Sequence, residues 1–346
     1  MSNSGLKRTL ISSAARAPGF ALGVTVAERV APVRTATLSI LTYHRVAEPW
    51  STPELDPRLV SATPDGFREQ MTILARSYDF LSIADLLAIR RGERDVTSRA
   101  LMLTFDDAYS DFAEHAWPVL RDLRLPVTLF VPTAFPGDAG RSFWWDRVHG
   151  ALMTAAEQSV ETPFGPCSLA TPAHRSRAVR FVQHRLTQLP HDELVETVDA
   201  LCDSLAARPA RGSVLSWSQL RELAAEGVTL APHTQTHALL DQVTAQRARV
   251  EITGAVRELE RQVGTCARVF AYPGGAYTRE VVELLEQEGF ELGVTTERGV
   301  NRIDSVDWLR LRRINVGQRS NAALIRAQIA LFSRRRPREP AVQRCH

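Results

Sequence analysis

Seven short apolar segments recur along the chain, and most are followed by a stretch with helical periodicity. Three of the helical stretches stop at a glycine that could end a helix in the left-handed conformation, namely Gly227, Gly264 and Gly289. Strands and helices that alternate over this length predict a parallel sheet, either open or closed into a barrel. The predicted strands are 38–41, 101–105, 127–131, 228–230, 269–272, 292–295 and 314–316, and the predicted helices include 67–78, 217–226, 245–263, 278–288 and 322–332.

Residues from about 138 to 215 interrupt this alternation. They contain no convincing strand, but they hold Trp144, Trp145, Thr-Pro pairs and a polar helical run. The stretch is too long for a simple loop, so we predict a helical insertion within the barrel. The expected organisation is an N-terminal segment (1–36), an α/β barrel (37–320) with this insertion, and a C-terminal helix with a basic tail (321–346).

The composition is that of an ordinary globular protein. Of 346 residues, 44% are hydrophobic and 23% are charged, which excludes a fibrous or wholly disordered chain. With 42 basic and 39 acidic residues the net charge is +3, too small to suggest a nucleic-acid partner. The four cysteines have no CxxC spacing, so they indicate neither a zinc ribbon nor a disulfide framework.

The same arguments give an expected location. Scattered reduced thiols suit the cytoplasm, and charged residues and a proline interrupt the apolar N-terminal stretch, unlike a signal peptide. The sequence contains no run of 18 apolar residues, so it predicts no transmembrane span. A short amphipathic helix near 24–30 and the arginine-rich tail at 334–338 allow peripheral membrane contact, although packing against the domain and a solvated tail are the favoured interpretations.

Two adjacent carboxylates end one predicted strand. Asp106 and Asp107 follow the apolar run 101–105, and a barrel keeps its active site at this end of its strands. Neighbouring residues on an extended chain point to opposite faces, so the two acids should have different environments. One could bind a cation while the other accepts a proton. The alternative is that one acid only caps a helix.

A pair of histidines follows another predicted strand. His233 and His237 are four residues apart, which on one helical turn would place both imidazoles on the same face. Two imidazoles and a carboxylate are a common catalytic zinc set. Thr234 stands where the HExxH metallopeptidases have glutamate, so that class is excluded. A third strand ends in Pro273-Gly274-Gly275, which either forms a plain tight turn or offers a backbone N–H to an oxyanion.

Together these motifs resemble those of the polysaccharide deacetylases, a carbohydrate esterase family with a distorted (β/α) barrel. Thr104-Phe105-Asp106-Asp107 is similar to the family's TFDD motif, and residues 233–237 are similar to its H-S/T-x-x-H motif. The resemblance implies that Asp106 is the general base. It also implies that Asp107, His233 and His237 hold a divalent metal ion, with Zn²⁺ as the expected metal.

Other segments resemble the exopolysaccharide-associated branch of this family. Tyr272-Pro273-Gly274-Gly275 looks like the third motif, which lines the substrate groove and supplies the oxyanion N–H. The segments 41–46 and 143–146 are also similar to this branch. Trp145 is therefore a candidate to stack on a sugar ring, although it could instead pack the insertion onto the barrel.

Two departures from the family pattern concern the proton-transfer groups. Ala271 stands where many members have an arginine that orients the base, and the late histidine motif that carries the general acid is missing. His44 follows the first strand at the same barrel mouth, so it is our candidate for the acid or for a substrate contact.

The implied function is metal-dependent removal of N-acetyl groups from amino sugars of a poly- or oligosaccharide, in exopolysaccharide or cell-surface glycan metabolism. One alternative is a deformylase or deacetylase of a lipid-linked sugar precursor, which a cytoplasmic location would favour. Another is a non-catalytic carbohydrate-binding relative, suggested by the missing arginine and histidine.

Overall fold

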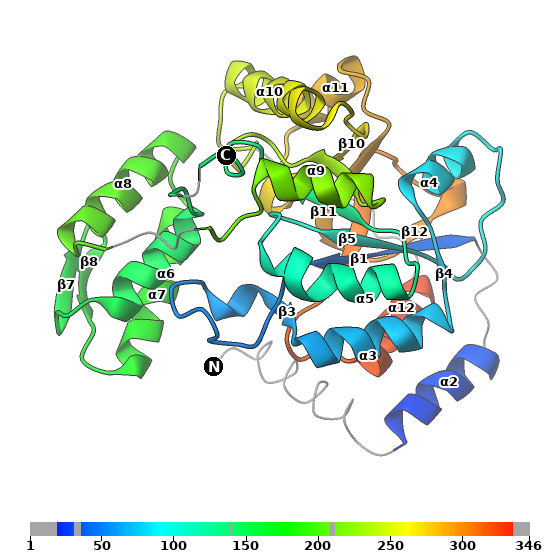
Figure 1. The fold of residues 1–346 in the computed structure, drawn as a ribbon, viewed down its shortest axis with the longest axis horizontal. Coiled ribbons are helices and arrows are strands. Elements are labelled where there is room, and N and C mark those ends of the chain that lie inside the picture. The colour runs from blue at the N-terminus through cyan, green and yellow to red at the C-terminus, as the bar shows by residue number, and fades with distance from the viewer. Residues whose placement is uncertain (1–18, 31–35, 139, 208–211, 335–346) are drawn as a thin grey trace.

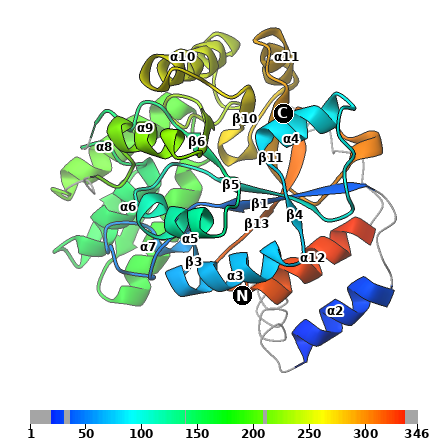
Figure 2. The same ribbon diagram turned by 45° about the vertical axis from the view of Figure 1, so that its right-hand side comes forward.

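The computed structural model describes residues 19–30, 36–138, 140–207 and 212–334. The first 18 residues and the arginine-rich tail beyond residue 334 lie outside the described residues. None of the helices in the described ranges is long and apolar enough to cross a membrane. Helix α2 (Phe20–Val30) packs against α12 (Ala322–Arg334), and Figure 2 shows the two helices side by side below the barrel.

A parallel sheet forms the centre of the molecule. All seven predicted strands are present and follow the order β10-β11-β13-β1-β5-β6-β9. The two end strands, β9 and β10, lie against each other, so the sheet is nearly closed and the predicted distorted barrel is confirmed. The strands are β1 (Thr37–Tyr43), β5 (Ala100–Phe105), β6 (Thr128–Val131), β9 (Thr229–Pro232), β10 (Val269–Ala271), β11 (Leu292–Arg298) and β13 (Leu311–Asn315).

Short strands extend this sheet and form a second, smaller pair. Within the main sheet β12 (Asn301–Arg302) pairs antiparallel with β1, and β4 (Asp79–Phe80) pairs parallel with β5. The strands β2 (Arg45–Val46) and β3 (Val60–Ala62) pair with each other beside the barrel.

The strands are largely apolar because most of their residues are buried on both faces of the sheet. On β1, Leu38 and Ile40 belong to one core cluster, whereas Leu41 and Tyr43 belong to another. The same alternation places Met102 in the first cluster and its neighbours on β5 in the second. Residues that continue the first parity beyond the strand ends therefore point into the barrel.

Helices cover the outside of the sheet, as Figure 1 shows. α10 begins after Thr244, whose side chain accepts a hydrogen bond from the Arg247 N–H, and it ends at Gly264, which has a φ of 83°. The covering helices are α3 (Pro64–Ala75), α4 (Ile83–Arg90), α5 (Trp117–Asp122), α9 (Trp217–Ala225), α10 (Ala245–Val263), α11 (Arg279–Gln287) and α12. Single helical turns occur at Pro57–Leu59, Phe112–Ala116, Pro273–Gly275 and Ile303–Ser305.

The predicted insertion lies beside the barrel and is mainly helical, on the left in Figure 1. It contains α6 (Trp144–Thr154), α7 (Pro172–Leu186) and α8 (His191–Ser204), which enclose a hydrophobic core of their own. The expectation of no strand was wrong, because β7 (Ser159–Thr162) and β8 (Gly165–Ser168) form an antiparallel hairpin. These strands bury few apolar side chains, chiefly Val160 and Cys167, so they lack the apolar run that marks the barrel strands.

Candidate active site

Asp106 forms a buried ion pair with an arginine from a different strand. Asp106 follows β5, and Arg313 lies on β13, on the other side of β1. The two guanidinium nitrogens donate to the two carboxylate oxygens at 2.8 and 2.7 Å. The Arg313 side chain is 0% exposed and also donates to the Thr295 carbonyl oxygen. This bidentate contact fixes the orientation of the carboxylate.

The ion pair keeps Asp106 ionised. Burial alone would raise the pKa of this carboxyl, but the charge and hydrogen bonds of Arg313 outweigh it and bring the pKa to about 2. The Arg313 guanidinium thus stabilises the Asp106 carboxylate at the mouth of the barrel, close to the imidazoles of His44 and His233. Many members of the family have an arginine at the position of Ala271. In this chain Arg313, from another strand, pairs with Asp106 instead.

Asp107 faces the two histidines, so the two adjacent acids have different environments, as predicted. Its Oδ1 atom lies 3.6 Å from Nε2 of His233 and 3.4 Å from Nε2 of His237. Asp107 has a φ of 73°, and His237 has a φ of 58°, so both hold backbone conformations that side-chain-bearing residues rarely adopt. Such backbone strain is concentrated at functional sites.

Asp107, His233 and His237 fit a single divalent metal ion, and these three candidate ligands are named the metal cluster. Their nearest ligand atoms all lie within 4.8 Å of one another. Asp107 Oδ1 is buried and has no hydrogen-bond donor in the described part of the chain, so a cation would satisfy it. The His233 Nδ1–H donates to the Ala271 carbonyl at 2.7 Å, which leaves Nε2 free as the ligand atom.

Burial also sets the charge of these ligands. It raises the pKa of Asp107, together with the charge of Asp106, and it lowers the pKa of His233 to about 4. Burial likewise lowers the pKa of His237 well below its ordinary value. Neutral imidazoles can coordinate a metal ion, and a bound cation would restore the ionised form of Asp107.

The two histidines do not share a helical turn, so that prediction was wrong. Residues 233–237 form an irregular loop after β9, held by the buried Glu251 of α10. The Glu251 carboxylate accepts the backbone N–H groups of Gln235 and Thr236, each at 2.9 Å. These two hydrogen bonds hold the loop in the conformation that brings both imidazoles close to Asp107.

His44 lies at the same barrel mouth as Asp106. It follows β1 directly, and the register pairs Tyr43 of β1 with Phe105 of β5, so His44 is level with Asp106. Its side chain is partly buried, and burial lowers its pKa, while the charge of Asp106 opposes this effect. The structure therefore brings His44 to the carboxylate that sequence analysis assigned as the base.

The third predicted motif divides into a buried part and an exposed part. Tyr272 is 0% exposed, and its hydroxyl donates to the Leu309 carbonyl at 2.8 Å, so the prediction that Tyr272 contacts substrate was wrong. Pro273 is also buried and only shapes the turn. Gly274 is exposed with a φ of 60°, a conformation that glycine adopts without strain.

Trp145 stands beside a candidate metal ligand. Its ring lies edge-to-face with His237 at 4.8 Å between centroids, and it stacks on Phe143 at 4.6 Å. It is partly exposed, at the start of α6. The indole thus forms a wall next to the metal cluster, and it also packs the insertion onto the barrel.

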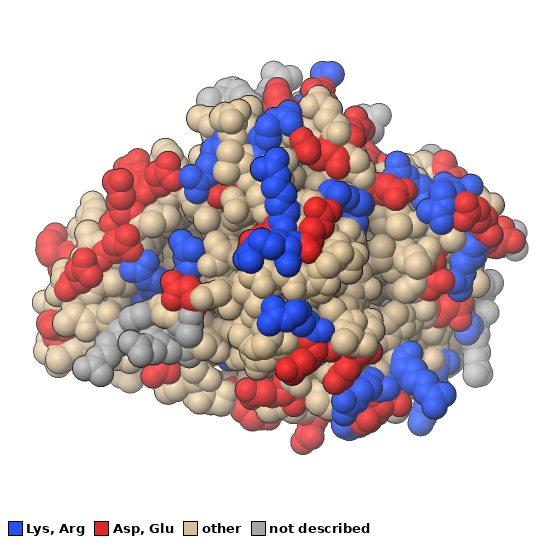
Figure 3. Space-filling model, turned by 45° about the horizontal axis from the view of Figure 1, so that its top comes forward, with Lys and Arg blue, Asp and Glu red and all other residues tan. Residues whose placement is uncertain are grey.

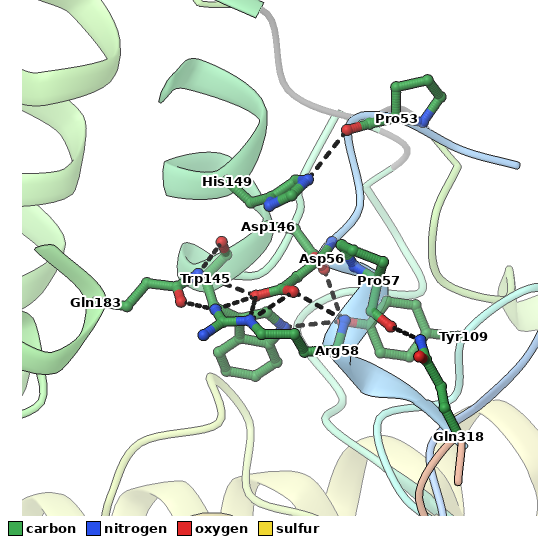
Figure 4. Close-up of polar contacts among 10 residues, drawn as sticks. All are labelled: Pro53, Asp56, Pro57, Arg58, Tyr109, Trp145, Asp146, His149, Gln183 and Gln318. Atoms are coloured by element: carbon green, nitrogen blue, oxygen red, sulfur yellow. Dashed lines mark hydrogen bonds and ion pairs between the residues drawn. The ribbon is translucent and has the colours of Figure 1, made fainter. Parts of the chain in front are cut away.

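A buried hydrogen-bond network holds Trp145 in place, as Figure 4 shows. The Tyr109 hydroxyl donates to Asp146 at 2.6 Å and accepts the indole N–H of Trp145 at 2.9 Å. The other Asp146 oxygen accepts the Asp56 backbone N–H at 2.8 Å. Gln183 of α7 donates to the Trp145 carbonyl at 2.8 Å. The position of the indole therefore depends on both the barrel and the insertion.

Three residues of this site were missed by sequence analysis: Arg313, Glu251 and Tyr109. A signal existed for Arg313, because a charged residue within an apolar strand must find a buried partner. Glu251 shows a weaker signal, since it stands among the inward-facing residues Ala248 and Ile252 of α10. Tyr109 gives no signal, because an aromatic residue after the Asp-Asp motif is equally compatible with plain packing.

Replacing Arg313 by methionine should strongly destabilise the protein. The Arg313→Met variant leaves the Asp106 carboxylate buried without its counter-charge, which costs about 3–5 kcal/mol. Denaturant unfolding measures the loss, and Arg279→Met, which removes an exposed pair with Glu283 on α11, should cost less than about 1 kcal/mol. Equal losses in the two variants would contradict a special role for the buried pair.

Asp146 should make the folding stability fall as pH rises. Burial raises its pKa to about 7, although the Tyr109 hydrogen bond opposes this. The folded state then holds a proton that the unfolded chain has released at any pH between the ordinary carboxyl pKa and about 7. Asp146→Asn removes this effect, so the wild type's advantage over the variant should shrink between about pH 4 and about pH 7. A constant difference between their melting temperatures would show that Asp146 titrates normally.

The chain is similar to known carbohydrate deacetylases. The model of the polysaccharide deacetylase family matches residues 93–293. The poly-beta-1,6-N-acetyl-D-glucosamine N-deacetylase of Escherichia coli strain K12 is 22% identical over 281 residues, which cover 73% of this chain and 33% of that protein. The chain spans 33% to 39% of the length of the curated relatives that it matches.

Solved structures of deacetylases share the fold. The Streptococcus pyogenes deacetylase PplD, in complex with acetate, is 20% identical with a TM-score of 0.56, covering 85% of this chain and 99% of that one. IcaB from Ammonifex degensii is 19% identical with a TM-score of 0.54, covering 87% and 98%. The region that the family model matches includes the Asp-Asp motif and both histidines of the metal cluster, and it exceeds half of the chain. The chain therefore belongs to the polysaccharide deacetylase family.

Proposed function

We propose that this protein is a metal-dependent N-deacetylase that hydrolyses acetamido groups on amino sugars of an exopolysaccharide or cell-surface glycan. The observation that carries the proposal is the convergence of Asp107, His233 and His237 beside the arginine-paired Asp106. The printed name of the E. coli relative makes a β-1,6-linked N-acetylglucosamine oligomer the first substrate to test.

The proposed metal ion is zinc, held by Asp107, His233 and His237. Two imidazoles and one carboxylate are a frequent catalytic zinc set that leaves a coordination position open. A bound zinc ion would lower the pKa of water and polarise the acetyl carbonyl. Asp106 does not serve as a ligand in this proposal, because the ligand atoms that converge within 4.8 Å are those of Asp107, His233 and His237, whereas Arg313 orients the Asp106 carboxylate.

The remaining steps belong to the chain's own residues. Asp106 accepts a proton from the attacking water, and Arg313 holds its carboxylate in a fixed orientation. The Gly274 backbone N–H donates to the developing oxyanion, and Trp145 supplies an apolar wall for the acetyl group or the sugar ring. His44 gives a proton to the departing amine.

The presence of Arg313 bears on the non-catalytic alternative. The absence of the usual arginine before Tyr272 was one reason to consider a binding protein without activity. The structure has a fully buried guanidinium on Asp106 from β13 instead, so this reason no longer applies. The catalytic interpretation is therefore the one that the geometry favours.

Replacing the proposed base should abolish most of the activity. Asp106→Asn is expected to lower kcat by about 10²–10⁴, measured as acetate release by the metal-loaded enzyme from N-acetylglucosamine oligomers. The matched control is Asp122→Asn, at an exposed position on α5, which should leave the rate unchanged. Full activity in Asp106→Asn, with metal content equal to that of the wild type, would eliminate Asp106 as the base.

The proposed acid should be visible in the pH profile. A general acid works only while protonated, so activity that depends on His44 decreases as pH rises through the His44 pKa. Burial lowers that pKa, which places the decrease below the ordinary histidine value of 6.5. In His44→Gln this decrease in kcat/KM should disappear along with most of the rate. A variant with the wild-type profile would assign the acid to another group.

A further inference from the structure

A groove of about 690 Å³ separates the insertion from the barrel and reaches the metal cluster. Its lining includes His237 and Thr236 at the barrel side and one face of α8 at the insertion side. Phe135, Phe143 and Trp144 contribute apolar surface between them. The groove is open to solvent and partly aromatic, so sugar rings could stack along it.

One wall of the groove is a stripe of carboxylates on α8. Asp192, Glu196, Asp199 and Asp203 all line the groove, at spacings of four, three and four residues that place them on one helical face. Asp192 lies in the first turn of α8, where the helix dipole favours an acid, but like charges at these spacings destabilise a helix, so helix stability does not explain the other three. Acidic side chains gather over the insertion, at the left of the space-filling view in Figure 3.

The arginines that line the groove pair with only one carboxylate of this stripe. Arg147 pairs with Asp199 at 2.6 Å, and Arg247 pairs with the buried Glu251 at 3.0 Å. The Arg141 guanidinium lies over the ring of Phe135 and donates to a backbone carbonyl. Three carboxylates of the stripe therefore have no cationic partner within the described ranges; they are Asp192, Glu196 and Asp203.

A second, independent feature of the groove indicates a polar ligand. Ser142 lines it and is 6% exposed, and its hydroxyl has no hydrogen-bond partner among the described residues. A buried hydroxyl without a partner is uncommon in folded proteins and costs stability. A hydroxyl or amide of a sugar bound in the groove would supply the missing hydrogen bond.

We infer that this groove binds the glycan and that the acidic face of α8 binds its free amino groups, so the preferred substrate is a partly deacetylated chain. This inference rests on the proposed function. Hydrolysis of an acetamide by water gives acetate and a protonated amine, so each turnover adds one positive charge to the glycan. Those charges are attracted to α8, and the attraction keeps the remaining acetamido groups of the same chain near His237.

The first test compares two substrates of equal length with the metal-loaded enzyme. One is a fully acetylated N-acetylglucosamine oligomer, and the other carries free amines on part of its sugars. The wild type should prefer the amine-bearing oligomer about 5- to 50-fold in kcat/KM, mostly through KM, as expected for a few exposed ion pairs. The preference should decline between about 0.05 M and about 0.5 M salt, because salt screens exposed charges.

The variant Asp192→Asn/Glu196→Gln/Asp203→Asn should lose this preference, so that its kcat/KM values on the two oligomers become nearly equal. Glu193→Gln is the matched control, since Glu193 is an exposed acid on α8 that does not line the groove. A preference that is absent in the wild type, or unchanged in the triple variant, overturns the inference and leaves the proposed deacetylase intact.

A binding measurement separates the inference from the proposed activity. Calorimetric titration with a fully deacetylated glucosamine oligomer should show binding to the wild type that weakens about 5- to 50-fold in the triple variant and not in Glu193→Gln. If no acetate is released from either substrate but this pattern of binding appears, the groove is supported and the proposed reaction is wrong. Equal binding by the wild type and the triple variant overturns the inference that the acidic face of α8 binds free amino groups.

Discussion

The bidentate ion pair between Asp106 and Arg313 is the interaction on which the arrangement of the site depends. A carboxylate buried at the end of β5 would otherwise take up a proton, because burial favours its neutral form. The guanidinium reverses this preference and occupies both carboxylate oxygens from inside the barrel. As a result Asp106 stays ionised and fixed, while the adjacent Asp107 is left to face the two histidines.

Asp106 and Asp107 therefore differ in pKa and in the groups they face, although they are adjacent in the chain. Asp106 has a counter-ion within the protein, whereas Asp107 has burial and a like charge beside it, which raise its pKa. A cation between Asp107, His233 and His237 would satisfy the orphaned carboxylate oxygen and both imidazole nitrogens. The strained backbone at Asp107 and His237 is maintained by the packed barrel and by the Glu251 contacts to the histidine loop.

The insertion contributes to the site as well as to the outline of the molecule. Its first helix carries Trp145 to the edge of the metal cluster, where the Tyr109–Asp146 contact fixes the indole from the barrel side. Its last helix, α8, forms the opposite wall of the groove. The same segment that has no barrel strand thus sets the shape and the charge of the approach to the metal cluster.

Local sequence was sufficient to predict the seven barrel strands, the glycines that end three helices, and the Asp-Asp and His-x-x-x-His motifs. Each of these features involves only a few consecutive residues: an apolar run, a glycine that ends a helix, such as Gly264, or polar residues that follow a strand. Tertiary structure alone decided that Arg313, 207 residues beyond Asp106, replaces the guanidinium missing before Tyr272. It also buried the Tyr272 ring and turned the expected helical turn at His233 into a loop held by Glu251. These outcomes depend on which strands become neighbours when the sheet closes, and strand order is not contained in any local pattern.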